Sequence, residues 1–161
     1  LGSEADRGFR KMLFLDSGLE LRMLNLTLGS VTEITKQILT ASVEDLVNKG
    51  DMAEMIAGLE ILHNQPPNLK YDMYYWIRLA KNAQAEIDYI LPRNSTVVPF
   101  EVKAERQGGM KSLWNFMREK RLTEGIRCSL ENFGEFDYSD NVEGGVKRHI
   151  TIHPLYALSQ L

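Results

Sequence analysis

The sequence has few residues of the kinds that mark secreted, membrane-bound or zinc-binding proteins. It contains 161 residues with one cysteine, Cys128, and three histidines. A single thiol forms no internal disulfide and supplies no zinc cluster, so we expect a reducing, cytoplasmic location. The longest apolar run, Met73–Ile77, has five residues, far fewer than the ~20 that span a bilayer. The formal net charge of −3 predicts neither a polybasic membrane anchor nor a nucleic-acid coat.

The amino-acid composition as a whole is typical of a globular protein. Hydrophobic residues make up 43% of the chain and charged residues 25%, and this length suits one domain with a single core. We therefore expect residues 1–161 to form one domain. The chain begins with Leu1 rather than methionine, which suggests a C-terminal piece of a longer protein.

Hydrophobic periodicity predicts alternating groups of helices and strands. Helices are predicted over Asp16–Leu24, where Asp16 is an expected N-cap, and over Asp45–His63 and Met110–Arg121. Strands are predicted over Tyr71–Arg78, Ala85–Leu91, Thr96–Ala104, Ile126–Leu130 and Val146–Ile152. An acidic loop is expected around Gly134–Gly145, and a short helical turn over Pro154–Leu161. This order favours a compact α/β or α+β fold with a mixed sheet, a central antiparallel hairpin and flanking helices.

The residues with the clearest chemical pattern lie on the predicted central hairpin. Asp88 precedes Glu101 by thirteen positions, and the midpoint of the pair falls in the turn between the two strands. A hairpin folded there sets Asp88 opposite Glu101, while Lys103 shares a strand face with Glu101. Facing carboxylates repel each other, so a cation is expected between them: either Lys103 or a divalent metal. Oxygen ligands without histidine or cysteine favour Mg²⁺, or Mn²⁺.

Six short motifs occur in an order that resembles a known family. They are Met12–Leu19, Gly50–Glu54, Tyr74–Trp76, Glu86–Tyr89, Glu101–Lys103 and Ser112–Leu113. Together they are similar to the C-terminal domain of unknown function in predicted prokaryotic AAA+-type ATPases. Asp88 with Glu101-Val-Lys103 also resembles the signature of the PD-(D/E)xK nuclease superfamily, although Ile87 stands where a proline often precedes the aspartate.

The resemblance implies a restriction-endonuclease-like core and a set of site residues. Asp88 and Glu101 would bind the metal, Glu54 would bind a second ion or a water on the metal, and Lys103 would assist the attacking water. The implied catalytic set is Glu54, Asp88, Glu101 and Lys103. It also implies an ATPase domain on the same polypeptide as a partner, which would bind ATP upstream of Leu1. The present chain lacks a phosphate-binding loop, since Gly109-Met110-Lys111-Ser112 misses the required glycines.

A local excess of basic residues suggests DNA as a further partner. Residues 100–127 carry seven bases and four acids, and Lys111, Arg118 and Arg121 are candidate phosphate contacts. Three hypotheses stay open at this point. The chain is a metal-dependent nuclease domain, a catalytically inactive nuclease-fold module that binds DNA or protein within the ATPase, or a structural cap that helps ATPase subunits assemble.

Overall fold

The computed structural model describes residues 5–23, 46–68, 70–80, 83–93, 95–104 and 109–160. Its helices are α1 (Ser17–Met23), α3 (Leu46–His63) and α4 (Lys111–Glu119), with short 3-10 segments η3 (Asn141–Glu143) and η4 (Leu155–Gln160). Its strands are β1 (Tyr74–Ala80), β2 (Ala83–Arg93), β3 (Thr96–Val102), β4 (Glu124–Ser129), β5 (Gly134–Asp140) and β6 (Val146–Pro154). The protein is therefore a mixed α+β structure. None of the helices in the described ranges has the length and hydropathy of a membrane span.

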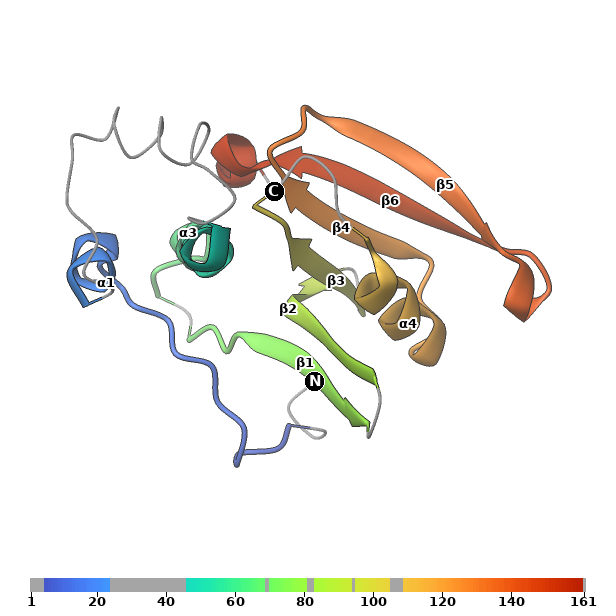
Figure 1. The fold of residues 1–161 in the computed structure, drawn as a ribbon, viewed down its shortest axis with the longest axis horizontal. Coiled ribbons are helices and arrows are strands. Elements are labelled where there is room, and N and C mark those ends of the chain that lie inside the picture. The colour runs from blue at the N-terminus through green and yellow to red at the C-terminus, as the bar shows by residue number, and fades with distance from the viewer. Residues whose placement is uncertain are drawn as a thin grey trace.

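One mixed sheet organises the described part of the chain (Figure 1). The strand order is β1-β2-β3-β4-β6-β5. Strands β1, β2 and β3 are antiparallel, β3, β4 and β6 are parallel, and β5 returns antiparallel to β6. The parallel pair β3 and β4 is connected through α4, because parallel neighbours need a crossover.

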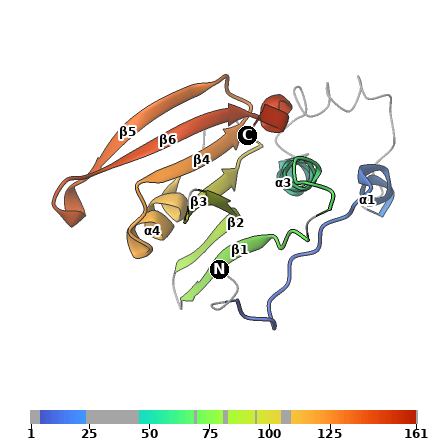
Figure 2. The same cartoon turned by 180° about the vertical axis from the view of Figure 1, so that it is seen from behind.

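Two hydrophobic clusters fill the two sides of this sheet. Under α3, Ala53, Ala57 and Ile61 pack on strand residues that include Phe100 and Val102. Under α4, a second cluster joins residues of the helix to three strand isoleucines: Leu113, Phe116, Met117, Ile87, Ile90 and Ile150. Figures 1 and 2 show α3 close to the C-terminal η4, while α4 lies on another part of the sheet. The central hairpin is therefore held between two helices.

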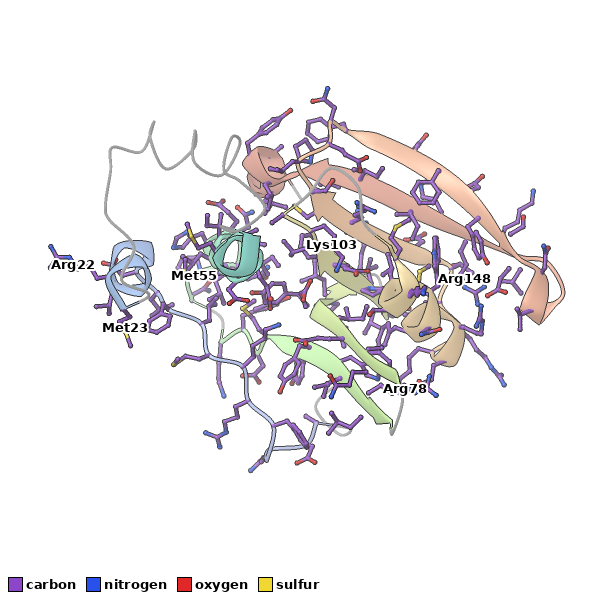
Figure 3. The ribbon with its side chains drawn as sticks, in the orientation of Figure 1. Arg22, Met23, Met55, Arg78, Lys103 and Arg148 are labelled. Carbon is purple, nitrogen blue, oxygen red and sulfur yellow. The ribbon has the colours of Figure 1, made fainter. Side chains whose placement is uncertain are left out.

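A buried ionic network joins α4 to the far edge of the sheet. The Asp140 carboxylate accepts hydrogen bonds from Arg118 Nε at 2.9 Å and Arg148 Nη1 at 3.0 Å. Arg148, labelled beside α4 in Figure 3, also donates from Nε to the Leu122 carbonyl at 3.2 Å. Because both Asp140 and Arg148 are buried, each needs the opposite charge of the other.

The predicted elements are present, and one prediction is wrong. The acidic loop expected around Gly134–Gly145 contains β5, which pairs with β6 over seven residues. The cause is a period-two pattern. Phe136 and Tyr138 turn toward Trp114 of α4, with ring centroids 6.2 and 4.4 Å away, while the alternating acids Glu135 and Asp137 face solvent. Asp16 caps α1 as predicted, accepting from Leu19 N–H at 2.9 Å. The predicted boundary residues Leu24, Asp45 and Leu161 lie outside the described ranges.

Two glycines of α3 provide a matched test of how closely this helix approaches the hairpin. A Cβ at Gly58 would collide with the Tyr89 hydroxyl and lie 2.9 Å from Leu13 Cδ1, whereas one at Gly50 would meet nothing within 4 Å. We predict that Gly58→Ala destabilises the protein by ~1–3 kcal/mol through overpacking. Gly50→Ala should instead stabilise it by up to ~1 kcal/mol through helix propensity. Urea denaturation of both variants checks this, and equal effects would contradict it.

Candidate acidic metal site

An irregularity in β2 determines where Asp88 points. Tyr74 pairs with Ile90 and Trp76 with Ile87, so two steps of β1 face three steps of β2. The extra residue lies at Asp88–Tyr89, and such a bulge interrupts the alternation of side chains. Ile87 and Ile90 consequently both pack under α4, while Tyr89 packs under α3 and donates to the Glu54 carbonyl at 2.8 Å.

The bulge brings Asp88 to two other carboxylates, which we call the acidic cluster: Glu54, Glu86 and Asp88. One oxygen from each lies within 4.8 Å of the others. Lys11, from the segment that precedes α1, inserts its ammonium among them. Its Nζ lies 2.7 Å from Glu86 Oε1 and 3.7 Å from Asp88 Oδ1, and it forms an ion pair with Glu54. Residues 5–16, here called the N-terminal arm, carry this lysine past β1 to α1 (Figure 1).

Burial and mutual repulsion shift the titration of this cluster. The pKa of the Asp88 carboxyl is raised to about 7, chiefly by burial and then by the Glu54 carboxylate, while the Val102 N–H bond, Lys11 and Lys103 act in the opposite direction. Burial also raises the pKa of Glu54, and Lys11 opposes that shift. Burial lowers the pKa of Lys11, but its bonds to Glu54 and Glu86 outweigh burial and leave it above the ordinary value. The cluster therefore favours an added cation.

Glu101 and Lys103 form a separate pair beside this cluster. In the hairpin, Tyr89 pairs with Phe100. The same register, continued by one residue on each strand, puts Asp88 opposite Glu101, as the sequence predicts. Phe100 and Val102 pack under α3, so alternation turns the Glu101 side chain to the other side of the sheet. Its Oε1 pairs with Lys103 Nζ at 2.8 Å. The Asp88 carboxylate instead accepts from Val102 N–H at 2.7 Å.

The predicted catalytic residues are thus divided into two neighbouring groups. Glu54 and Asp88 are in the acidic cluster, and Glu101 and Lys103 are paired at the end of β3, where Figure 3 labels Lys103. Glu101 Oε2 is buried and, within the described residues, has no hydrogen-bond partner. A buried carboxylate oxygen is costly when no polar or cationic group satisfies it.

A cavity of about 480 Å³ opens over the acidic cluster. Its walls are residues 9–14 of the N-terminal arm, Asp51, Glu54 and Met55 of α3, and Met73–Tyr75 leading into β1. Asp88 and Tyr89 form its floor. The Tyr75 ring lies 5.7 Å from Lys11 Nζ, a cation–π distance. The cluster is therefore reached from solvent through a cleft that combines charged and aromatic side chains.

The predicted phosphate contacts lie away from this cleft. Lys111 and Arg121 are exposed, whereas the Arg118 guanidinium bonds to buried Asp140. Two residues that contribute to the site, Glu86 and Lys11, were not among the sequence candidates. Glu86 stands two positions from Asp88, and strand alternation alone would have indicated it. Lys11 is brought in by the tertiary fold, and no local pattern indicates it.

Fold and site together define an α+β protein with a cleft over three carboxylates. The family model for the domain of unknown function DUF4143 matches residues 49–148, and the chain belongs to this family. The matched region includes Glu54, Glu86, Asp88, Glu101 and Lys103, whereas Lys11 precedes it. The assignment is consistent with the uncharacterised domain of AAA-type ATPases that the motifs resemble. Searches of curated proteins and of solved structures each gave no match.

The raised pKa of Asp88 predicts how stability depends on pH without divalent ions. Between about pH 4 and pH 7 the folded protein holds a proton on Asp88 that the unfolded chain releases. The contribution of this carboxyl to stability therefore falls as the pH rises through that window. Asp88→Asn removes the titration, so its free energy of unfolding relative to wild type should increase from pH 4 to pH 7.

Urea denaturation at both pH values measures this difference. Asp72→Asn is the control, because Asp72 is exposed and pairs with Lys70 outside the acidic cluster. Parallel pH profiles for wild type and Asp88→Asn would show that Asp88 titrates normally.

Proposed function

We propose that this protein is a nuclease-like domain of an AAA+-type ATPase, with a restriction-endonuclease-like core, that hydrolyses DNA phosphodiester bonds with Mg²⁺ or Mn²⁺. The observation that carries the proposal is the convergence of Glu54 from α3 with Glu86 and Asp88 from β2, two of which, Glu54 and Asp88, line one cleft. Lys103 stands on the adjacent strand end, close enough to lower the pKa of Asp88. The membership in DUF4143 is compatible with it.

The residues present fit a hard divalent cation. The acidic cluster offers three carboxylate oxygens and neither nitrogen nor sulfur, the donor set that Mg²⁺ and Mn²⁺ prefer. Glu54, Glu86 and Asp88 would hold the ion. Glu101 on the next strand has a buried oxygen without a hydrogen-bond partner in the described structure, but its side chain turns to the other side of the sheet, where it pairs with Lys103. A bound divalent ion supplies positive charge to phosphate oxygens and acidifies water.

The other residues have roles that follow from their contacts. Val102 N–H holds Asp88 in place through its 2.7 Å hydrogen bond, and Tyr89 fixes the Glu54 segment of α3. Glu101 orients the Lys103 ammonium through an ion pair of 2.8 Å. An oriented ammonium beside the reacting phosphate would stabilise the charge that develops in the transition state. Tyr75 gives the mouth of the cleft an aromatic surface for the substrate.

One observation favours a second function, a catalytically inactive module that binds DNA or protein within the ATPase. The ammonium of Lys11 already neutralises part of the acidic cluster, and Glu101 and Lys103 are paired with each other. A site whose charges are compensated internally folds without a metal. Under this alternative the cleft is kept for contacts alone, since a nuclease-like fold does not by itself imply cleavage.

Metal binding is the first test. We predict that the protein binds Mn²⁺ weakly and that Asp88→Asn abolishes the binding, because Asp88 is the most buried carboxylate of the acidic cluster. Asp72→Asn, which removes an equal charge from an exposed position, should bind like wild type. Calorimetric titration measures all three proteins. Equal heats from wild type and Asp88→Asn would exclude these carboxylates as the site.

Cleavage separates the two proposed functions. We predict that Lys103→Met lowers Mn²⁺-dependent nicking of supercoiled plasmid and of single strands by roughly 100- to 1000-fold, the usual effect of removing one transition-state donor. DNA and metal affinity should change little. Lys70→Met, at an exposed lysine outside the cleft, is the matched control.

A binding module would behave differently in the same assay. Wild type would show no metal-dependent cleavage, alone or within the full-length ATPase with ATP. Lys103→Met would then weaken DNA binding, and the slope of log affinity against log salt concentration would decrease by about one phosphate contact. No cleavage from either form on either substrate would overturn the nuclease proposal.

A further inference from the structure

Lys11 occupies the position that a metal ion bound to the acidic cluster would take. Its Nζ contacts Glu54 Oε1, Glu86 Oε1 and Asp88 Oδ1, one oxygen from each carboxylate. Ligand oxygens of the same three residues lie within 4.8 Å of one another. Two oxygens that each stand about 2.1 Å from one Mg²⁺ are at most about 4.2 Å apart. If the three carboxylates moved slightly closer together, their oxygens could thus coordinate one ion. That ion would lie where the Lys11 ammonium now lies.

The charges favour replacement of the ammonium by a divalent ion. With all three carboxylates ionised, the cluster carries −3, and Lys11 reduces this to −2. A divalent ion in the same place would reduce it to −1. Like charges held this close in a partly buried site repel each other, so the ion relieves more repulsion than the lysine does.

The position of Lys11 on the N-terminal arm would let its side chain leave the acidic cluster. The N-terminal arm from residue 5 to residue 16 contains no helix or strand, whereas the carboxylates stand on α3 and β2. Lys11 is therefore the easier partner to move. The Tyr75 ring, 5.7 Å from Nζ in the wall of the same cavity, is already within cation–π distance and would remain a partner for the ammonium once it left the carboxylates.

We infer that Lys11 is a tethered cation that competes with the metal ion for the acidic cluster. It holds the three carboxylates together in the metal-free protein and leaves when the ion binds, turning toward Tyr75 and the open part of the cleft. The inference rests on the metal site of the proposed function. It makes Lys11 a positioning residue and the N-terminal arm a regulator of metal entry.

Mn²⁺ affinity tests the competition. Lys11→Met should bind Mn²⁺ about tenfold or more tightly than wild type, because the binding-competent state is no longer blocked. Lys11→Arg keeps the charge and should bind about as weakly as wild type. Lys70→Met controls for the loss of a positive charge elsewhere. Unchanged or weaker binding by Lys11→Met, measured by calorimetry, would overturn the inference.

A second measurement uses the unaltered protein and does not depend on how the variants fold. Acylation of lysines by an amine reagent, mapped by peptide mass spectrometry, should increase at Lys11 when Mn²⁺ is added and stay constant at Lys70. Asp88→Asn should remove the increase at Lys11. Protection or no change at Lys11 in a protein that binds Mn²⁺ would show that the lysine stays in place, against the inference.

The inference and the proposed function fail in different ways. Tighter Mn²⁺ binding by Lys11→Met together with no DNA cleavage would support the competition and overturn the nuclease. Metal-dependent DNA cleavage by wild type, together with an unchanged Mn²⁺ affinity in Lys11→Met, would support the nuclease and overturn the competition. Absence of Mn²⁺ binding in both wild type and Lys11→Met would overturn the inference as well as the metal site.

Discussion

The hydrogen bond from the Tyr89 hydroxyl to the Glu54 carbonyl fixes α3 against the central hairpin, and the acidic cluster depends on it. Tyr89 reaches the helix because it lies at the bulge of β2, and the helix can approach because Gly58 has no Cβ to collide with the hydroxyl. The residue before Tyr89 is Asp88, and the carbonyl that accepts the bond belongs to Glu54. One contact thereby brings together the carboxylates of Glu54 on α3 and Asp88 on β2. The packing of the two backbones, rather than the side-chain conformations, sets the distance between these carboxylates.

Packing of this kind forces charges together that would otherwise stay apart. The pKa of Asp88, raised to about 7 mainly by burial, is the visible consequence. Most buried carboxylates in proteins are matched by a fixed basic partner, as Asp140 is by Arg148 in the same chain. The acidic cluster has three carboxylates to one lysine in its contacts, and that lysine comes from an arm without regular structure. This imbalance distinguishes the acidic cluster from the Asp140–Arg148 ion pair, and it is the charge pattern that the proposed cation site requires.

The sequence predicted the central hairpin well because antiparallel register and turn position determine each other. The midpoint between Asp88 and Glu101 falls at the turn, and the observed pairing of Tyr89 with Phe100 has the same register. It did not predict the bulge, which depends on how β1, β2 and α3 pack together and which turns Asp88 toward α3. The strand β5 was missed for another reason: its acids and glycines suggest a loop, although Phe136 and Tyr138 alternate with them toward Trp114.

Sequence order explains why Lys11 escapes a motif-based prediction. Glu54, Glu86, Asp88, Glu101 and Lys103 all lie in the region that matches DUF4143, whereas Lys11 precedes it. The carboxylates are carried by a helix and a strand that the two hydrophobic clusters fix in place, and their counter-ion is carried by the arm that crosses the cleft. The charge balance of the site is therefore shared between elements fixed by the core and an arm without regular structure. Under the proposed competition, displacement of the arm would remove the Lys11 charge from the carboxylates, so access to the cleft and affinity for a cation would increase together.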